Sequence, residues 1–202
     1  MKKTIIAALV IIIISFVIGI YLYPQMPDKM ASHWNAQGIV DGYSSKFIGL
    51  FLMPIISLAM LLLFLVIPHI DPLKSNIKKF RNYFDAFILI IFVFLFYLYV
   101  LTLIWNFGFV YNIILFLVPA FAFLFFFAGI LIEKAKRNFF IGIRTPWTLS
   151  NEKVWDNTHK VGGKLFKIAS IVSLVGLFFQ KYAILFVLVP IIFVSLYTIV
   201  YS

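Results

Sequence analysis

The stretch Phe84–Trp105, FDAFILIIFVFLFYLYVLTLIW, decides the fold class of this chain. Its one charged residue is Asp85, at the start of the run, and its length matches the roughly 20 apolar residues that cross the hydrocarbon core of a bilayer. A strand of a membrane barrel would alternate apolar and polar side chains, whereas this run is apolar on every side. The stretch therefore predicts a membrane-spanning helix.

Five further runs of the same kind lie on either side of it: Thr4–Tyr23, Phe47–Ile67, Ile113–Ile132, Leu165–Phe179 and Tyr182–Val200. Overall, 64% of the residues are hydrophobic and 12% are charged, against about 45–50% and about 25% in soluble domains. We therefore predict an all-α integral membrane protein, with residues 1–202 forming a single polytopic domain of six transmembrane helices.

The first run follows Lys2 and Lys3, as the apolar core of a signal peptide would. It is longer than such a core and has no small-residue cleavage site after it, so we expect an uncleaved first helix. The chain has no cysteine, which excludes disulfides, thiolate chemistry and cysteine-based metal sites.

The 17 lysines and arginines are distributed unevenly between the two sides of the predicted bundle. The side with both termini holds fourteen of them, and the other side holds only Lys29, Lys46 and Lys181. Because such an excess marks the cytoplasmic face, we predict that both termini and the loops 68–83 and 133–164 lie on the cytoplasmic side of the cell membrane, and that the loop 24–46 lies on the outer side. The basic surplus predicts contact with anionic lipid headgroups and not with nucleic acid.

The outer loop 24–46 carries apolar side chains at a helical spacing. Met26, Met30 and Trp34 recur at i, i+4 and i+8, and Gly38 follows them. The spacing predicts a short amphipathic helix on the outer membrane surface, ending near Gly38.

The long inner loop is expected to contain a second interfacial helix. Thr145-Pro146 interrupts any helix from upstream, and Ser150 is a suitable N-cap for a new one. That helix is predicted to lie at the membrane surface until Gly162-Gly163, where the fifth spanning helix begins.

Two sets of polar and aromatic residues are candidate ligand or partner sites. The outer set is Asp28, His33, Trp34, Asn35 and Asp41, and the inner set is Arg144, Trp147, Glu152, Trp155 and His159. The spacing of the outer set matches no recognised metal-ligand pattern, and Ser150 with His159 lacks the surroundings of a hydrolase pair. We predict no catalytic residue, no metal and no cofactor. Ionisable residues are absent from the middle of the apolar runs, which argues against a proton-coupled transporter.

Arg144 is the most specific member of the inner set. Its planar guanidinium can hold a carboxylate or a phosphate through two parallel hydrogen bonds. The alternatives are that it neutralises Glu152 or Asp156, or that it contacts the phosphate of a lipid.

The inner loop also resembles the signature of a known family. The run from Asn138 to Glu152, NFFIGIRTPWTLSNE, followed by Val154-Trp155 and by His159 to Gly162, is similar to the signature of the SdpI family of bacterial membrane proteins. The outer loop resembles the uncharacterised N-terminal region that often precedes this signature, in the residues Met26-Pro27-Asp28, His33-Trp34-Asn35, Gly38, Asp41-Gly42 and Ser45-Lys46.

The resemblance implies a role in immunity or signal reception against an external toxic peptide or envelope stress. It also implies two partners, a toxic peptide outside and a repressor-like protein in the cytoplasm. Two other functions remain open: a carrier or channel for a small neutral or anionic solute, and a membrane enzyme that uses Arg144 and His159 on a lipid-like substrate.

Overall fold

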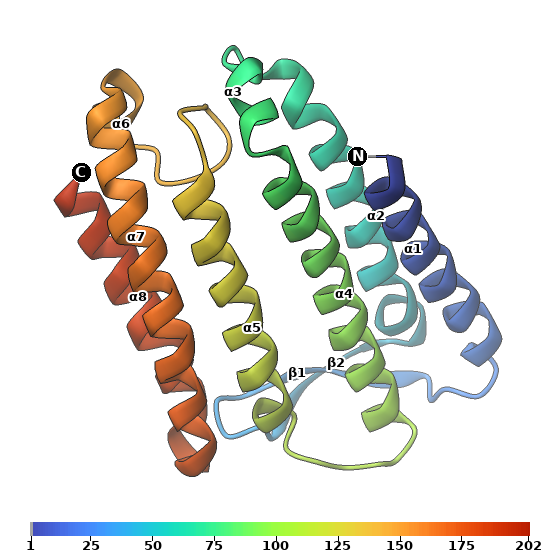
Figure 1. Ribbon diagram of the computed structural model, residues 1–202. Helices are drawn as coiled ribbons and strands as arrows, with labels where there is room; N and C mark the ends of the chain where they lie inside the picture. Colours follow the sequence, from blue (N-terminus) through green and yellow to red (C-terminus); the bar gives the residue numbers. More distant parts are fainter. Residues whose placement is uncertain (1) are drawn as a thin grey trace.

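The computed structural model describes residues 2–202, and six long helices dominate it (Figure 1). All six are long and apolar enough to cross a membrane, the fifth together with the 3-10 turn that follows it. This confirms the predicted all-α membrane fold. The helices are α1 (Lys2–Leu22), α2 (Lys46–Ile70), α4 (Arg81–Asn106), α5 (Ile113–Lys134), α7 (Glu152–Ser173) and α8 (Ala183–Tyr201).

The short elements lie at the two ends of this bundle. Helices α3 (Lys74–Lys79) and α6 (Pro146–Ser150) lie at the end where α1 begins and α8 finishes, which we call the termini face (Figure 1). The opposite end, the hairpin face, carries β1 (Lys29–Trp34) and β2 (Val40–Ser45). Two 3-10 turns, η1 (Leu174–Phe178) and η2 (Gln180–Tyr182), join α7 to α8.

The six helices form two groups of three. Helices α1, α2 and α4 pack on one another and make the first half, and α5, α7 and α8 make the second half. The halves meet along α4 and α5, which stand side by side in the centre of Figure 1. Helices α7 and α8 are antiparallel neighbours.

The second half is held together by a close approach of α5 and α7. A Cβ added at Gly129 would lie 2.7 Å from the carbonyl oxygen of Gly163, and one added at Gly163 would lie 2.6 Å from the carbonyl oxygen of Gly129. Small residues at such a crossing let two membrane helices approach until their backbones touch. Lys167 and Glu133 then form an ion pair across the same two helices, at 2.6 Å.

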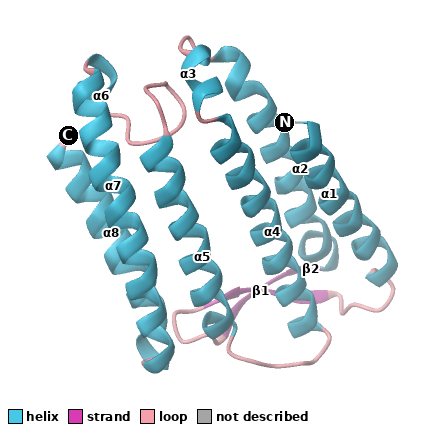
Figure 2. Ribbon diagram, in the orientation of Figure 1, coloured by secondary structure: helices cyan, strands magenta, loops and turns pink. Residues whose placement is uncertain are grey.

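The predicted surface helix in the outer loop is wrong, because the segment folds as a β-hairpin (Figure 2). Strands β1 and β2 pair antiparallel, and Gly38, with φ +78°, lies in the turn between them. Met30 and Ala31 are consecutive and both fully buried. The predicted helical stripe would bury Met30 but would leave Ala31 on another side of the helix. Ala31 owes its burial to the end of α4, where the Asn106 side chain bonds both of its backbone polar groups.

The inner loop also differs from its prediction at two points. Asn151, and not Ser150, is the N-cap of the following helix, and its side chain accepts the backbone N–H groups of Lys153 and Val154. Ser150 is instead the last residue of α6. Helix α7 continues through Gly162-Gly163 without interruption, so the expected interfacial helix and the fifth spanning helix are one element. The expected break at Thr145-Pro146 is confirmed, since Thr145 caps α6 and Pro146 begins it.

Candidate functional site

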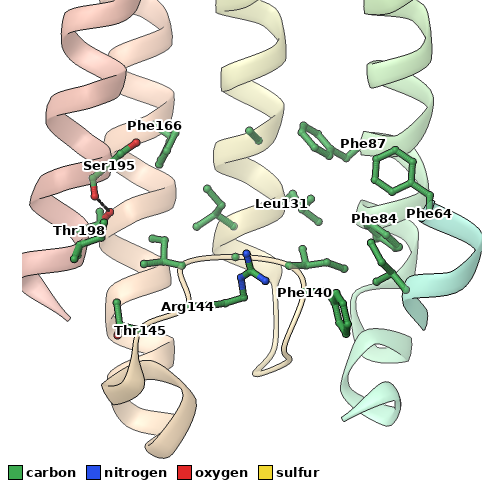
Figure 3. Close-up of a pocket in the computed structure, with 17 residues that line it drawn as sticks. Phe64, Phe84, Phe87, Leu131, Phe140, Arg144, Thr145, Phe166, Ser195 and Thr198 are labelled. Atoms are coloured by element: carbon green, nitrogen blue, oxygen red, sulfur yellow. Dashed lines mark hydrogen bonds between the residues drawn. The ribbon is translucent and has the colours of Figure 1, made fainter. Parts of the chain in front are cut away.

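A cavity of about 480 Å³ lies on the termini face, between the two halves (Figure 3). The first half contributes Ile67 and the aromatic side chains Phe64, Phe84 and Phe87, and α8 contributes Ser195, Thr198 and Ile199. The rest of the lining comes from α5, from Phe166 of α7 and from the loop 135–145, which lies across the cavity. The site therefore combines an apolar wall, a weakly polar wall and a loop that carries a cation.

That cation is Arg144, whose guanidinium lies between the phenylalanine wall and the hydroxyl wall in Figure 3. One of its terminal nitrogens donates to the carbonyl oxygen of Phe139 at 2.8 Å. Within residues 2–202, no carboxylate forms an ion pair with it. Asp156, one of the expected partners, pairs with Lys136 instead, at 3.3 Å.

The loop that carries Arg144 is built around the buried amide of Asn138. Its nitrogen donates to the carbonyl oxygens of Lys136 and Ile141, at 2.8 and 2.9 Å. Its oxygen accepts the backbone N–H groups of Phe140 and Ile141, at 2.9 and 2.7 Å. All four hydrogen-bonding positions of the amide are occupied, so a single side chain fixes the tight turn that leads to Arg144.

His159 anchors the other end of this turn to α7. Its Nδ1 lies 2.8 Å from the carbonyl oxygen of Trp155, and its Nε2 lies 3.0 Å from the backbone nitrogen of Ile143. A carbonyl can only accept and an amide N–H can only donate, so the ring is neutral, with its proton on Nδ1. The imidazole also stacks on Trp155, with ring centroids 3.8 Å apart. Because both rings are buried, the pair is a rigid support for the backbone of Gly142 and Ile143, the two residues before Arg144.

Two polar side chains of the first half bind the same loop. Asp71, at the end of α2, accepts the backbone N–H of Phe139 at 2.9 Å, and Asn76 of α3 donates to the carbonyl oxygen of Arg137 at 2.9 Å. The loop therefore belongs to the second half in sequence but bridges both halves in space.

The predicted inner residues are only partly brought together. Trp155 and His159 support the loop, and Arg144 reaches the cavity from it. Trp147 is exposed on α6 and Glu152 is exposed at the start of α7, and neither lines the cavity.

The predicted outer residues lie on the hairpin face, at the other end of the bundle. His33 pairs with Asp41 across the two strands, and Asp28 pairs with Lys46 at 3.0 Å. The side-chain oxygen of Asn35 accepts two backbone N–H groups of the turn. Trp34 packs edge-on against Trp105, with ring centroids 5.8 Å apart. These contacts shape the hairpin and dock it onto α4.

Sequence reasoning missed several residues that build the site. Asp71 and Asn76 are close to Asn138 only in space, so no spacing in the sequence indicates that they belong to the site. Asn138 has a general signal only, because Asn side chains often bond the backbone two residues further on, as Asn138 does with Phe140. The phenylalanine wall is hidden among the 25 phenylalanines of the chain.

Comparison with known proteins supports the resemblance drawn from the motifs. Residues 134–202 match the SdpI/YfhL protein family, and residues 10–58 match a domain of unknown function, DUF1648. The immunity protein SdpI of Bacillus subtilis (strain 168) is 27% identical over 190 residues, which cover 94% of this chain and 88% of that protein. No solved structure matches the chain. The predicted resemblance to the SdpI family is thereby confirmed, and the chain is an SdpI-like multi-pass membrane protein.

Proposed function

We propose that this SdpI-like membrane protein is an immunity or signal-receptor protein that responds to a toxic peptide or another stress at the outer surface of the cell membrane. The hairpin face would lie outside and the termini face in the cytoplasm, in agreement with the distribution of lysine and arginine. The name of the Bacillus subtilis relative, an immunity protein, supports the same role.

The observation that carries this proposal is that α4 is bonded to the hairpin at one end and lines the cavity at the other. Asn106 accepts the backbone N–H of Ala31 at 2.8 Å and donates to its carbonyl oxygen at 3.0 Å. At the other end of the same helix, Phe84 and Phe87 form part of the cavity wall. A ligand that displaces the hairpin would therefore act on α4 directly, and a continuous helix transmits such a displacement to the cavity.

The outer surface also offers apolar contact area for a peptide. Ile39 and Tyr43 of the hairpin are 64% and 62% exposed, and Phe109 and Val110 of the loop between α4 and α5 are 70% and 75% exposed. Residues of both segments line a second hollow at the hairpin face. We assign peptide binding to this surface and the resulting response to the loop 135–145. We assign catalysis to neither of them.

The test is survival of cells that express the chain and are challenged with a panel of secreted bacterial peptides. We expect the wild type to raise survival against at least one peptide, and Asn106→Ala to lose that protection at an equal level of protein in the membrane. Ser44→Ala is the matched control, because its hydroxyl bonds only the neighbouring carbonyl of Ser45. Equal protection by wild type and Asn106→Ala would contradict transmission through α4. Absence of protection and of any envelope-stress reporter response would contradict the proposed role as a whole.

A further inference from the structure

We propose that the cavity on the termini face binds one anionic phospholipid, with its phosphate on Arg144 and an acyl chain against the phenylalanine wall. This inference goes beyond the proposed function and does not depend on it. It rests on the charge, the shape and the position of the cavity.

The charge at the cavity favours an anionic ligand. Arg144 is exposed to the cavity and has no carboxylate partner within residues 2–202. A guanidinium has five N–H donors, and the recorded contact with the carbonyl oxygen of Phe139 uses one of them. A phosphate suits the remaining donors, because its oxygens match the spacing of the guanidinium fork.

The apolar lining favours an anion that carries an apolar tail. Beyond Arg144, the lining is dominated by Phe64, Phe84, Phe87, Leu131 and Phe166. A volume of about 480 Å³ falls within the range of about 300–1,000 Å³ that is usual for small-molecule sites. Inorganic phosphate would leave this apolar wall in contact with water, whereas an acyl chain would cover it.

The position matches the arrangement of a lipid in a leaflet. Arg144 lies on the loop at the end of α5, and the lining extends along α4, α5 and α8 toward the middle of the bundle. A ligand with its polar end at the helix ends and its apolar end deeper in the bundle has the orientation of a phospholipid in the leaflet on that side. The basic residues of the termini face concentrate anionic lipids there.

The experiment is native mass spectrometry of the purified full chain in mild detergent, after equilibration with equal amounts of phosphatidylglycerol and phosphatidylcholine. We expect the wild type to retain one phosphatidylglycerol. Arg144→Gln should reduce that retention by about tenfold or more, as expected when a charge-assisted contact is lost. Arg144→Lys keeps the charge but not the fork, and should fall between the two. Lys153→Gln is the matched control, since it removes one exposed positive charge from the same face but lies outside the cavity lining.

A second variant tests the apolar part of the site. Ala128→Phe should fill the cavity while leaving Arg144 in place, and should also lose the bound lipid. Elution volume and thermal midpoint in detergent will show whether each variant folds. Equal retention by wild type and Arg144→Gln would overturn the proposal, and so would full retention by folded Ala128→Phe. Displacement of the lipid by millimolar inorganic phosphate would also overturn it, because the acyl chain would then contribute nothing.

Discussion

The imidazole of His159 occupies the space that a side chain at position 142 would need. A Cβ built on Gly142 would lie 2.3 Å from Nε2 of His159, well inside van der Waals contact. Gly142 also has φ +114°, which residues with a side chain rarely adopt. The glycine and the histidine are therefore one unit, in which the missing side chain of the first makes room for the ring that holds the loop.

Gly142→Ala is expected to release the loop that carries Arg144. Gly108→Ala is the matched control, because Gly108 has a similar φ of +99° but nothing within 4 Å of its added Cβ. Backbone strain alone costs about 1–2 kcal/mol, and only Gly142→Ala adds the clash with His159. The thermal midpoint in detergent should fall further for Gly142→Ala, and limited proteolysis should cut only that variant near residues 137–145. Equal shifts in both variants would show that strain alone accounts for the glycine.

The hydrogen bond from Ile143 to His159 can be tested while an aromatic ring is kept on Trp155. His159→Phe keeps an aromatic ring on Trp155 but removes the acceptor of the Ile143 N–H. An N–H group left unpaired in a buried position costs about 1–3 kcal/mol. We therefore expect faster hydrogen exchange at the Ile143 amide, with the amides of α5 unchanged. Unchanged exchange at Ile143 would mean that the loop is held from the first half, through Asp71 and Asn76.

The docking of the hairpin by Asn106 predicts a local effect on the hairpin face. Asn106→Ala removes both bonds to the backbone of Ala31 and leaves the pairing of β1 with β2 intact. The Ala31 amide should exchange faster by a factor of about ten, which corresponds to about 1.4 kcal/mol. Ser44→Ala should leave that rate unchanged. Slow exchange at Ala31 in Asn106→Ala would show that the packing of Trp34 on Trp105 is sufficient to dock the hairpin.

The orientation of the bundle can be measured with single cysteines, since the native chain has none. Ala36→Cys lies in the exposed turn of the hairpin, and Ser150→Cys lies at the exposed end of α6. With the termini face in the cytoplasm, a membrane-impermeant thiol reagent should label only position 36 in intact cells, and both positions after lysis. Labelling of position 150 alone would reverse the orientation.

Five spanning helices could be predicted from the sequence because each is an apolar run of sufficient length, and the surrounding bilayer requires its backbone to be hydrogen-bonded internally. The fifth spanning helix in chain order, α7, was predicted only from Leu165 onward, because its first half, from Glu152, is polar. The hairpin in the outer loop could not be predicted in this way. Met26, Met30 and Trp34 fit a helical period, but Met30 and Trp34 lie in a strand that pairs with β2, and the hairpin is docked by a contact 75 residues away, between Ala31 and Asn106. Likewise, Ser150 and Asn151 are both good N-caps in sequence, and only the short helix that ends at Ser150 decides between them.

The candidate site could likewise be predicted only in part. Arg144 and the Trp155–His159 pair were predicted from the motif that contains them. The cavity was not, because its walls are phenylalanines from distant helices, and their residue type does not distinguish a side chain that faces a cavity from one that faces lipid. Trp147 is predicted as a site residue from its residue type, although it is 59% exposed and does not line the cavity.

The division of the bundle into two halves has a consequence for how the protein is made. The loop 107–112 joins α4 to α5, and the helices of each half pack on one another. During synthesis, α1, α2 and α4 can complete their own packing before α5 leaves the ribosome. The helices α5, α7 and α8 then pack against the completed first half. Because the cavity is lined by both halves and by the bridging loop, we expect it to form only after the second half has packed against the first.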